Sequence, residues 1–307
     1  MYRPLEFRCH CKCKPGVLAT RKVRSYHTFG MMSLWEQQVT ATIAMTDQSE
    51  NSQLRDAASQ TRQLFIKHLK EDNFVLFFQP IVPAAVNSPD PSLREILVRY
   101  REEEEDLLPP GSFLPLLQEE GLLPILDRWV VGRLLTWGRT VQQGGVKMPH
   151  CSINLSIDTI RRDDQFGEYV LRGIQKMGVS AAAITFEIMT VDALAHRQAI
   201  AKFIQPLRAA GITFALSWFA GEEAAFDLAH SLGASYMKLD GSFAAMVGKY
   251  PQEKAKLAVI LQRCRKLGLR TICMQVEDAE SLAHLRMLQV DYVQGFGIEK
   301  PRALEGF

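Results

Sequence analysis

Short apolar runs alternate with amphipathic stretches of helix length along most of the chain. The apolar runs predict strands at residues 74–82, 93–100, 151–155, 183–188, 213–216, 236–239, 270–274 and 291–294. Between most of them lies a stretch such as 127–143 or 197–210, in which apolar residues recur at helical spacing. Because strands alternate with helices, the pattern predicts a mainly parallel sheet.

The number of these units favours one α/β architecture over another. Eight strand–helix units suit a closed TIM-like (β/α)8 barrel, a fold that usually takes about 250 residues. An open doubly wound sheet would show the same alternation, but no glycine-rich phosphate loop follows an early strand in this sequence. The pattern therefore favours the barrel.

The first part of the chain differs in composition from the rest. Residues 1–30 carry seven basic side chains and one acidic side chain, Glu6, in a chain whose net charge is +2. Residues 45–56 are polar and indicate a linker, and the apolar positions that follow indicate a helix. We predict a poorly ordered basic extension and linker at 1–53, a lead-in helix at 54–69 and a barrel domain at 70–307.

Composition excludes several classes of protein. With 307 residues and 47% hydrophobic content, the chain can bury a full core. A net charge of +2 gives no case for binding DNA or an anionic membrane. No apolar run approaches the roughly 20 residues that cross a bilayer, and the N-terminus lacks the apolar centre of a secretion signal. We therefore expect a cytoplasmic protein with no membrane insertion and no DNA partner.

The cysteines do not indicate a disulfide framework. Six cysteines are few for a chain of this length, and disulfide-rich folds are much smaller. Cys9, Cys11 and Cys13 form a cluster, but no fourth ligand follows at zinc-finger spacing.

Ordered motifs extend over residues 70–302. They are FFQPIV at 77–82, EILVRY at 95–100, LDRW at 126–129, NLS at 154–156, EIMTV at 187–191, KLD at 238–240, QGF at 294–296 and KP at 300–301. This series resembles the EAL-domain family, whose members hydrolyse the bacterial second messenger cyclic di-GMP in a metal-bearing barrel. The resemblance implies a TIM-like barrel of EAL type with an N-terminal extension, and it makes a homodimer possible. The motifs cluster at predicted strand ends, where barrel enzymes carry their chemistry.

Hydrolysis of a phosphodiester needs an activated water and compensation of the charge on the phosphoryl oxygens. Two divalent cations supply both, and Mg²⁺ and Mn²⁺ prefer oxygen ligands. The resemblance implies that Glu95, Asn154 and Glu187 correspond to three of these ligands. The alternative for each is a polar group near a loop with its hydrogen bonds satisfied.

Other expected ligands are missing. Ser217 and Trp218 stand where the family has two adjacent aspartates, and Met274 stands where it has a glutamate. A hydroxyl is a weak ligand, an indole is none, and a thioether suits softer metals. We therefore expect neither Mg²⁺ or Mn²⁺ binding nor efficient catalysis.

Much of the nucleotide-facing part of the motifs persists. The residues that resemble ligand-binding positions of the family are Gln79, Glu95, Leu97, Arg99, Asp127, Asn154, Glu187, Lys238, Asp240, Gln294, Gly295 and Pro301. The guanidinium of Arg99 is suited to a phosphate. Asp127 either accepts hydrogen bonds from a guanine edge or caps the following helix. Lys238 either contacts phosphate or pairs with Asp240 or Glu187.

The expected function is that of a catalytically inactive EAL-like domain. It would act as a cyclic di-GMP receptor or adaptor, with no other cofactor, and signal to a protein partner that the sequence does not identify. Two alternatives remain. One is a nucleotide-independent interaction regulator, favoured by the bulk of Trp218 and Met274, and the other is a weak metal-dependent phosphodiesterase.

Overall fold

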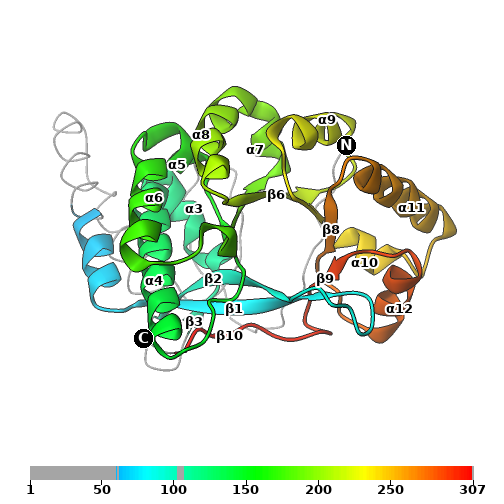
Figure 1. Cartoon of the computed structure of the whole chain (residues 1–307), viewed down its shortest axis with the longest axis horizontal. Coiled ribbons are helices and arrows are strands. Elements are labelled where there is room, and N and C mark those ends of the chain that lie inside the picture. Colours follow the sequence, from blue (N-terminus) through cyan, green and yellow to red (C-terminus); the bar gives the residue numbers. More distant parts are fainter. Residues whose placement is uncertain (1–59, 61, 102–106, 306–307) are drawn as a thin grey trace, which may run out of the picture.

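A computed structural model describes residue 60 and residues 62–101 and 107–305. Within these residues, ten strands form one sheet that closes on itself (Figure 1). The strands are β1 (Phe74–Pro83), β2 (Leu93–Arg101), β3 (Leu107–Leu108), β4 (Cys151–Asn154), β5 (Ile184–Met189), β6 (Thr213–Phe219), β7 (Tyr236–Leu239), β8 (Arg270–Cys273), β9 (Tyr292–Val293) and β10 (Arg302–Ala303).

The closed barrel consists of β1, β2 and β4 to β9, and β3 and β10 lie at its outer edge. Neighbouring strands from β2 and β4 through to β9 run parallel. β1 is the exception, because it pairs antiparallel with β2 on one side and with β9 on the other. No helix separates β1 from β2, so the chain returns directly and the first pairing is a hairpin.

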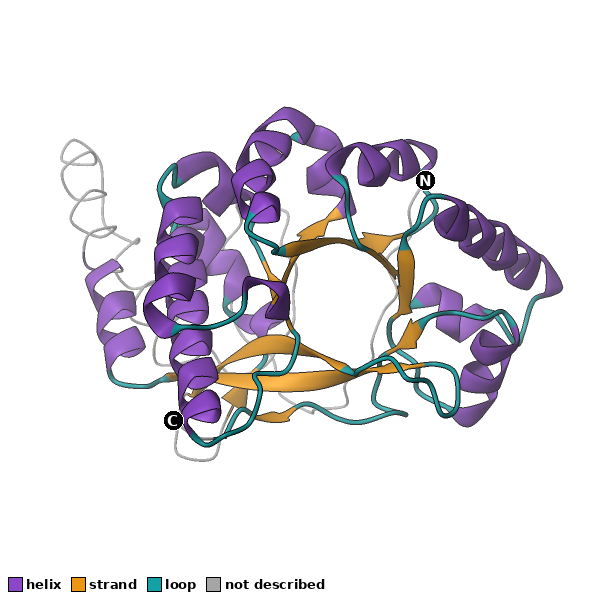
Figure 2. Cartoon of the chain, viewed as in Figure 1, coloured by secondary structure: helices purple, strands orange, loops and turns teal. Residues whose placement is uncertain are grey.

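Helices surround the barrel on its outside (Figure 2). They are α3 (Leu114–Glu119), α4 (Leu123–Gln143), α5 (Ile157–Arg162), α6 (Phe166–Met177), α7 (Thr190–Ala195), α8 (Arg197–Ala209), α9 (Glu223–Leu232), α10 (Ser242–Met246), α11 (Pro251–Lys266) and α12 (Ala279–Met287), with short 3-10 turns at Pro110–Ser112 and Ala181–Ala183. Their apolar faces pack on the outer face of the sheet. The strands are therefore buried on both faces, as β5 and β7 show.

The barrel interior is built in layers. An apolar layer consists of Ile81, Leu93, Ala215, Tyr236, Ile272 and Tyr292. Side chains two positions along a strand face the same side. The next layer toward the carboxyl ends of the parallel strands therefore consists of Gln79, Glu95, Ser217, Lys238, Met274 and Gln294. We call this set, with Glu187 of β5, the polar layer.

β1 and β2 continue beyond the polar layer as a two-stranded arm. β2 pairs with β4 only through Arg94–Ile96, whereas its pairing with β1 continues to Tyr100. Leu97 and Arg99 therefore lie on this arm, on the same face as Glu95. β10 covers the other edge of β1 at Phe77 and Phe78.

The α/β barrel predicted from the sequence is confirmed, and the predicted strands match the observed ones within a few residues. The largest difference in length is at β6, which continues to Phe219 through a register shift after Leu216. α4 begins at Leu123, ahead of the predicted residue 127, because Pro124 suits a first helical turn.

The predicted extension at 1–53, with its cysteine cluster, lies outside the described residues. Residue 60 and residues 62–70 are helical. Within the described part of the chain, no helix combines the length and apolar character that crossing a membrane requires.

Candidate functional site

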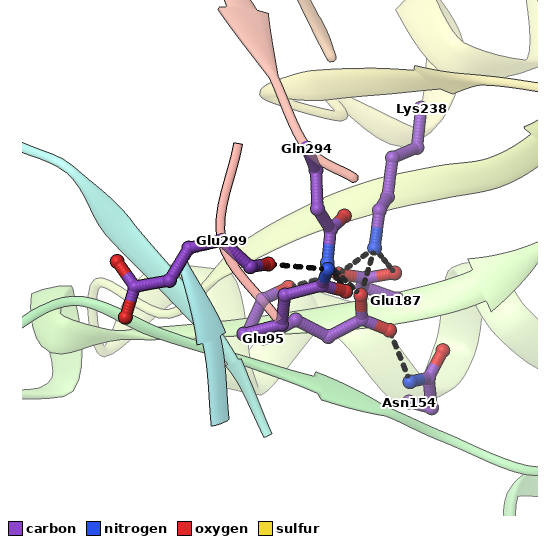
Figure 3. A network of polar contacts seen from close by, with 8 residues as sticks. Glu95, Asn154, Glu187, Lys238, Gln294 and Glu299 are labelled. Atoms are coloured by element: carbon purple, nitrogen blue, oxygen red, sulfur yellow. Dashed lines mark hydrogen bonds and ion pairs between the residues drawn. The ribbon is translucent and has the colours of Figure 1, made fainter. Parts of the chain in front are cut away.

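Lys238 lies at the centre of the polar layer, and its ammonium group contacts two carboxylates (Figure 3). Nζ lies 2.8 Å from Oε2 of Glu95, 2.9 Å from Oε1 of Glu187 and 2.8 Å from Oε2 of Glu187. The Lys238 and Glu187 side chains are each 1% exposed and that of Glu95 is 12% exposed. Lys238 of β7 thus supplies a buried positive charge that links the carboxylates of Glu95 on β2 and Glu187 on β5.

Glu95 also accepts hydrogen bonds from two amide side chains. Asn154 Nδ2 donates to Oε1 at 2.8 Å, and Gln294 Nε2 donates to Oε2 at 2.6 Å. The same Gln294 nitrogen lies 3.2 Å from Oε1 of Gln79. The predicted residues Gln79, Glu95, Asn154, Glu187, Lys238 and Gln294 therefore form one network.

The two carboxylates respond differently to burial. Burial raises the pKa of Glu187, and the charge of Glu95 adds to that rise against the opposing effect of Lys238. Burial also acts to raise the pKa of Glu95, but the charge of Lys238 and the hydrogen bonds to the carboxylate lower it overall. For Lys238, burial is outweighed by the two glutamates, so its pKa is raised. Lys238 is therefore charged at neutral pH and Glu95 is its ionised partner.

A cavity of about 410 Å³ opens above this network, within the size range of small-molecule sites. The predicted residues that line it are Gln79, Glu95, Glu187, Lys238, Gln294 and Gly295. The other lining residues are Trp218, Met274, Gln275, Glu277 and Phe296. Trp218 and Met274 lie at its wall and leave this volume open. Larger hollows lie outside the barrel between α8 and α9 and share no residue with the network.

The donor atoms around the cavity do not suit a pair of Mg²⁺ or Mn²⁺ ions. Glu95 and Glu187 are engaged by Lys238, and Met274 contributes a thioether. Ser217 is buried, and its Oγ has no hydrogen-bond partner among the described residues. Over the same residues, no group of three or more His, Cys, Asp or Glu side chains is arranged to hold a metal. Glu95 and Glu187 therefore cannot hold such ions while both contact Lys238, and Ser217 and Met274 add no carboxylate to them.

Asp127 does not line the cavity. It lies inside the first turns of α4 and accepts hydrogen bonds from the Ser156 backbone N–H at 3.1 Å and from Thr159 Oγ1 at 2.5 Å. The interpretation of Asp127 as a helix N-cap is wrong, because α4 begins earlier, at Leu123. Burial raises its pKa to about 7. Through these two hydrogen bonds, Asp127 connects α4 to the turn after β4 and to the first turn of α5.

Asp240 also lies away from the cavity lining. Its Oδ1 accepts a 2.8 Å hydrogen bond from the Ser242 backbone N–H at the start of α10. Of the two partners considered for Lys238, Glu187 is confirmed. Asp240 is not the partner, since it points into the turn that follows β7.

Leu97 and Arg99 lie on the two-stranded arm, and neither they nor Pro301 line the cavity. The Arg99 guanidinium lies 5.6 Å from the centre of the Phe77 ring, and its Nη1 donates to the Val98 carbonyl at 2.8 Å. Pro301 directly precedes β10, which pairs with β1. The structure thus brings together the residues of the polar network, and it places Leu97 and Arg99 on the arm, Asp127 in α4, Asp240 in the turn after β7 and Pro301 before β10.

Gly295 is required by a close approach of backbone. A Cβ at this position would lie 2.1 Å from the carbonyl oxygen of Val276. The Val276 N–H donates to the Gln294 carbonyl at 2.9 Å, so the segments after β8 and β9 are held side by side. This contact places Gln275, Glu277 and Phe296 around the cavity. None of the three is among the predicted ligand-binding residues, although Phe296 ends the QGF motif.

Residues 58–301 match the family model described as EAL domain. The chain is 27% identical over 240 residues to the cyclic di-GMP phosphodiesterase PdeB of Shewanella oneidensis, covering 78% of this chain and 28% of that protein. It is 28% identical over 271 residues to the cyclic di-GMP phosphodiesterase PdeF of Escherichia coli, covering 85% of this chain and 35% of that protein. The chain thus spans about a third of the length of these relatives.

Solved structures share the fold at lower identity. The FimX EAL domain of Xanthomonas citri, in complex with c-diGMP, aligns with a TM-score of 0.72 and 21% identity, over 82% of this chain and 97% of that one. The PaMucR phosphodiesterase in its c-di-GMP complex aligns with a TM-score of 0.71 and 23% identity, over 79% and 97% of the two chains. Motifs, barrel topology and the family match agree, and this chain belongs to the EAL domain family.

Proposed function

We propose that this chain binds cyclic di-GMP as a receptor and does not hydrolyse it efficiently. The contact of the Lys238 ammonium with both Glu95 and Glu187 carries this proposal. Two carboxylates held by a buried lysine are not available to bind metal ions without breaking that contact. Ser217 and Met274, in the same layer, offer no carboxylate to replace them.

Binding places fewer demands on the site than catalysis, because no transition-state charge must be matched. The barrel, the cavity of about 410 Å³ and the arm with Arg99 remain in place. Arg99 offers planar N–H donors for a phosphate outside the barrel mouth. The FimX EAL domain in complex with c-diGMP, which has the same fold, supports binding as the retained property.

One observation favours a second candidate, a nucleotide-independent interaction module. The cavity is lined by three carboxylates, those of Glu95, Glu187 and Glu277, and by one ammonium, that of Lys238. A dianionic ligand inside the cavity itself would meet net negative charge. Under the receptor proposal the phosphates must therefore lie toward Arg99.

Isothermal titration of the full chain with cyclic di-GMP, first in EDTA and then in Mg²⁺, tests the proposal. Saturable binding in EDTA is the expected result. Arg99→Ala should abolish or strongly weaken it, whereas Arg139→Ala, at an exposed position on α4, should leave it unchanged. The absence of heat and of a thermal shift in both buffers would overturn the receptor proposal and favour the interaction module.

A receptor must pass its signal to another molecule. Capture of proteins from a cell extract, with and without cyclic di-GMP, would identify a partner whose binding depends on the ligand. Light scattering with and without cyclic di-GMP would measure the molar mass of the chain in solution and so test whether it forms a homodimer. A ligand-dependent change in either measurement supports a signalling role beyond ligand binding.

A further inference from the structure

The face of the barrel opposite the cavity carries many cationic side chains. The parallel strands begin at this face, and because the helices run back along the outside of the barrel, their carboxyl ends lie here too. We call it the amino face. It consists of the last turns of the helices that precede a strand, the connections from these helices to the strands, and the loop between β1 and β2.

The acidic side chains of the amino face are already engaged, whereas most of its cations are not. Within the described residues of these turns and connections, the carboxylates are those of Asp90 and Asp291. Asp90 pairs with Arg270 at 2.5 Å, and Asp291 accepts a 2.7 Å hydrogen bond from the Thr271 hydroxyl. Six further cations are exposed and have no acidic partner in the described part of the chain, namely Lys147, Lys176, Arg208, Arg265, Lys266 and Arg286.

Backbone carbonyls hold the three arginines of this set in place. The carbonyls are those of Leu232 for Arg208, at 2.9 Å, Gln289 for Arg265, at 3.2 Å, and Ala84 for Arg286, at 2.7 Å. A neutral carbonyl fixes a guanidinium without cancelling its charge, and it uses one of five N–H donors. The remaining donors suit phosphate oxygens, which guanidinium groups bind in pairs.

Helix dipoles account for part of this arrangement. Cations stabilise the carboxyl end of a helix and carboxylates its amino end, so each helix favours the same separation of charge. Lys147 needs another account, since it lies outside any helix. Summed over the barrel, the charges differ between the two faces, which the net charge of +2 conceals. The first turns of the helices carry acidic residues at Glu168, Asp192, Glu223, Glu253 and Glu280.

Exposed aliphatic side chains lie among the cations of the amino face. Val86, in the loop between β1 and β2, is 71% exposed, Val146 is 61% exposed and Met287 is 63% exposed. Val146 directly precedes Lys147, and Met287 directly follows Arg286. Single exposed apolar residues are common on protein surfaces. Aliphatic side chains interspersed with unpaired cations are instead typical of a surface that lies on an anionic bilayer.

The aliphatic character of these side chains favours lipid over nucleic acid as the polyanion. Surfaces for single-stranded nucleic acid stack bases on aromatic rings, and none of the large apolar side chains exposed on the described part of the amino face is aromatic. A bilayer offers phosphate headgroups to the cations and an apolar boundary to the valines and the methionine. The cations also come from several separate turns around the barrel, an arrangement that suits a broad surface.

We infer that the amino face is a docking surface for anionic lipid headgroups, which holds the protein on a membrane surface without insertion of a helix. The cavity lies at the opposite face of the barrel, so it points away from the membrane in the docked protein. The inference goes beyond the proposed function and does not depend on it, since neither the six cations nor the three aliphatic residues line the cavity.

Flotation of the full chain with lipid vesicles tests the inference. One vesicle consists of phosphatidylcholine, and the other of equal parts of phosphatidylcholine and phosphatidylglycerol. We expect binding to the anionic vesicle only, and weaker binding as the salt concentration rises. Because residues 1–30 are also basic, binding by itself does not identify the amino face, and variants are needed.

The double change Lys147→Ala and Lys266→Ala should weaken binding about 25-fold, because each basic residue near an anionic surface contributes about 5-fold. Both lysines are exposed, so the fold should persist. The matched control is Arg161→Ala with Arg197→Ala, which removes the same charge from exposed positions in α5 and at the start of α8, on the cavity side. It should leave binding unchanged.

A second pair of changes tests the aliphatic side chains. Val146→Ser with Met287→Ser keeps every charge and should lower the binding to anionic vesicles that persists at high salt, where the electrostatic contribution is screened. Equal binding of this variant and the original chain at every salt concentration would show that the aliphatic residues do not enter the bilayer, and would overturn a lipid surface as the partner.

Three further outcomes decide the inference. Equal vesicle binding by the original chain and the double lysine variant overturns it, and so does the absence of binding to anionic vesicles. Binding to double-stranded DNA that the lysine variant loses, without binding to vesicles, assigns the amino face to nucleic acid instead. Calorimetry separates the inference from the receptor proposal, because the lysine variant should bind cyclic di-GMP as the original chain does. Vesicle binding by a chain that binds no cyclic di-GMP supports the docking surface and overturns the receptor.

Discussion

The ammonium nitrogen of Lys238 lies 2.8 Å from Oε2 of Glu187, and both side chains are 1% exposed. This pair lies in the barrel interior directly above a layer of apolar side chains. The contact therefore has two effects. It offsets the cost of burying charge within the core, and it occupies a carboxylate that the family motif places among metal ligands.

Lys238→Met should destabilise the protein by about 3–5 kcal/mol, because it leaves Glu95 and Glu187 buried without their cation. Chemical denaturation followed by circular dichroism would measure the change. The matched control is the triple change Lys238→Met, Glu95→Gln and Glu187→Gln, which removes all three charges and should recover most of the loss. Equal stability of Lys238→Met and the original chain would contradict a structural role for the pair.

Asp127 should make stability fall as pH rises through the acid range. Burial raises the pKa of the folded carboxyl to about 7 from an ordinary value of 3.8. Between these values the folded state keeps the proton and the unfolded state releases it, so the folded state binds more protons and raising the pH favours unfolding.

Asp127→Asn should remove this contribution, since an amide oxygen can accept the same hydrogen bonds from Ser156 and Thr159. The stability difference between the variant and the original chain should grow in favour of the variant from about pH 4 to pH 7 and then level off. Denaturant melts at several pH values would measure it, and a difference independent of pH would contradict the prediction.

If the absence of carboxylates at positions 217, 218 and 274 limits the hydrolysis of cyclic di-GMP, introducing them should increase the rate of hydrolysis. The triple change Ser217→Asp, Trp218→Asp and Met274→Glu should raise Mn²⁺-dependent turnover of cyclic di-GMP by more than about 100-fold, since several ligands are regained. Adding Glu187→Gln to the triple variant is the control and should abolish the gain. Comparable turnover by the original chain would instead favour a phosphodiesterase with an altered site.

Gly295→Ala should destabilise the protein by about 1–3 kcal/mol, because the new methyl group would overlap the Val276 carbonyl and force a backbone shift. The affinity for cyclic di-GMP should fall as well, because a backbone shift at residue 295 would also displace its neighbours Gln294 and Phe296. Gly111→Ala is the matched control, because an added Cβ there meets no atom within 4 Å. Thermal melts and calorimetry of both variants would measure the two effects.

Much of the fold follows from patterns that a sequence displays directly. Two-residue alternation in the strands predicts which side chains share a layer, and the motifs at strand ends predicted that Gln79, Glu95, Glu187, Lys238 and Gln294 would come together. The direction of β1 could be anticipated only from the short, helix-free connection to β2. Its pairing with β9 involves residues far apart in the chain, which local patterns do not specify.

The details of the site depend on tertiary contacts that the sequence does not display. Asp127 resembles a cap at a helix start, but the helix begins one turn earlier and the carboxyl binds the turn after β4. Trp218 and Gln275 have φ angles of +57° and +56°, which neither residue type prefers. Their conformations follow from the bulge in β6 and from the close approach of the segments after β8 and β9. The sequence shows Ser217, Trp218 and Met274 where the family motif has carboxylates, but it does not show that Trp218 lines the cavity.

The position of β1 has a consequence for how the protein is made. Gln79 precedes its partner Gln294 by 215 residues, and it precedes the Glu299 carbonyl that it also contacts by 220 residues. β9 and β10 pair with β1, so the ring of strands cannot close before these late strands have been synthesised. The contacts that close the ring are the same ones that complete the polar layer. A chain synthesised only as far as β8 therefore lacks Gln294, whose side chain donates to Glu95 in the completed polar layer.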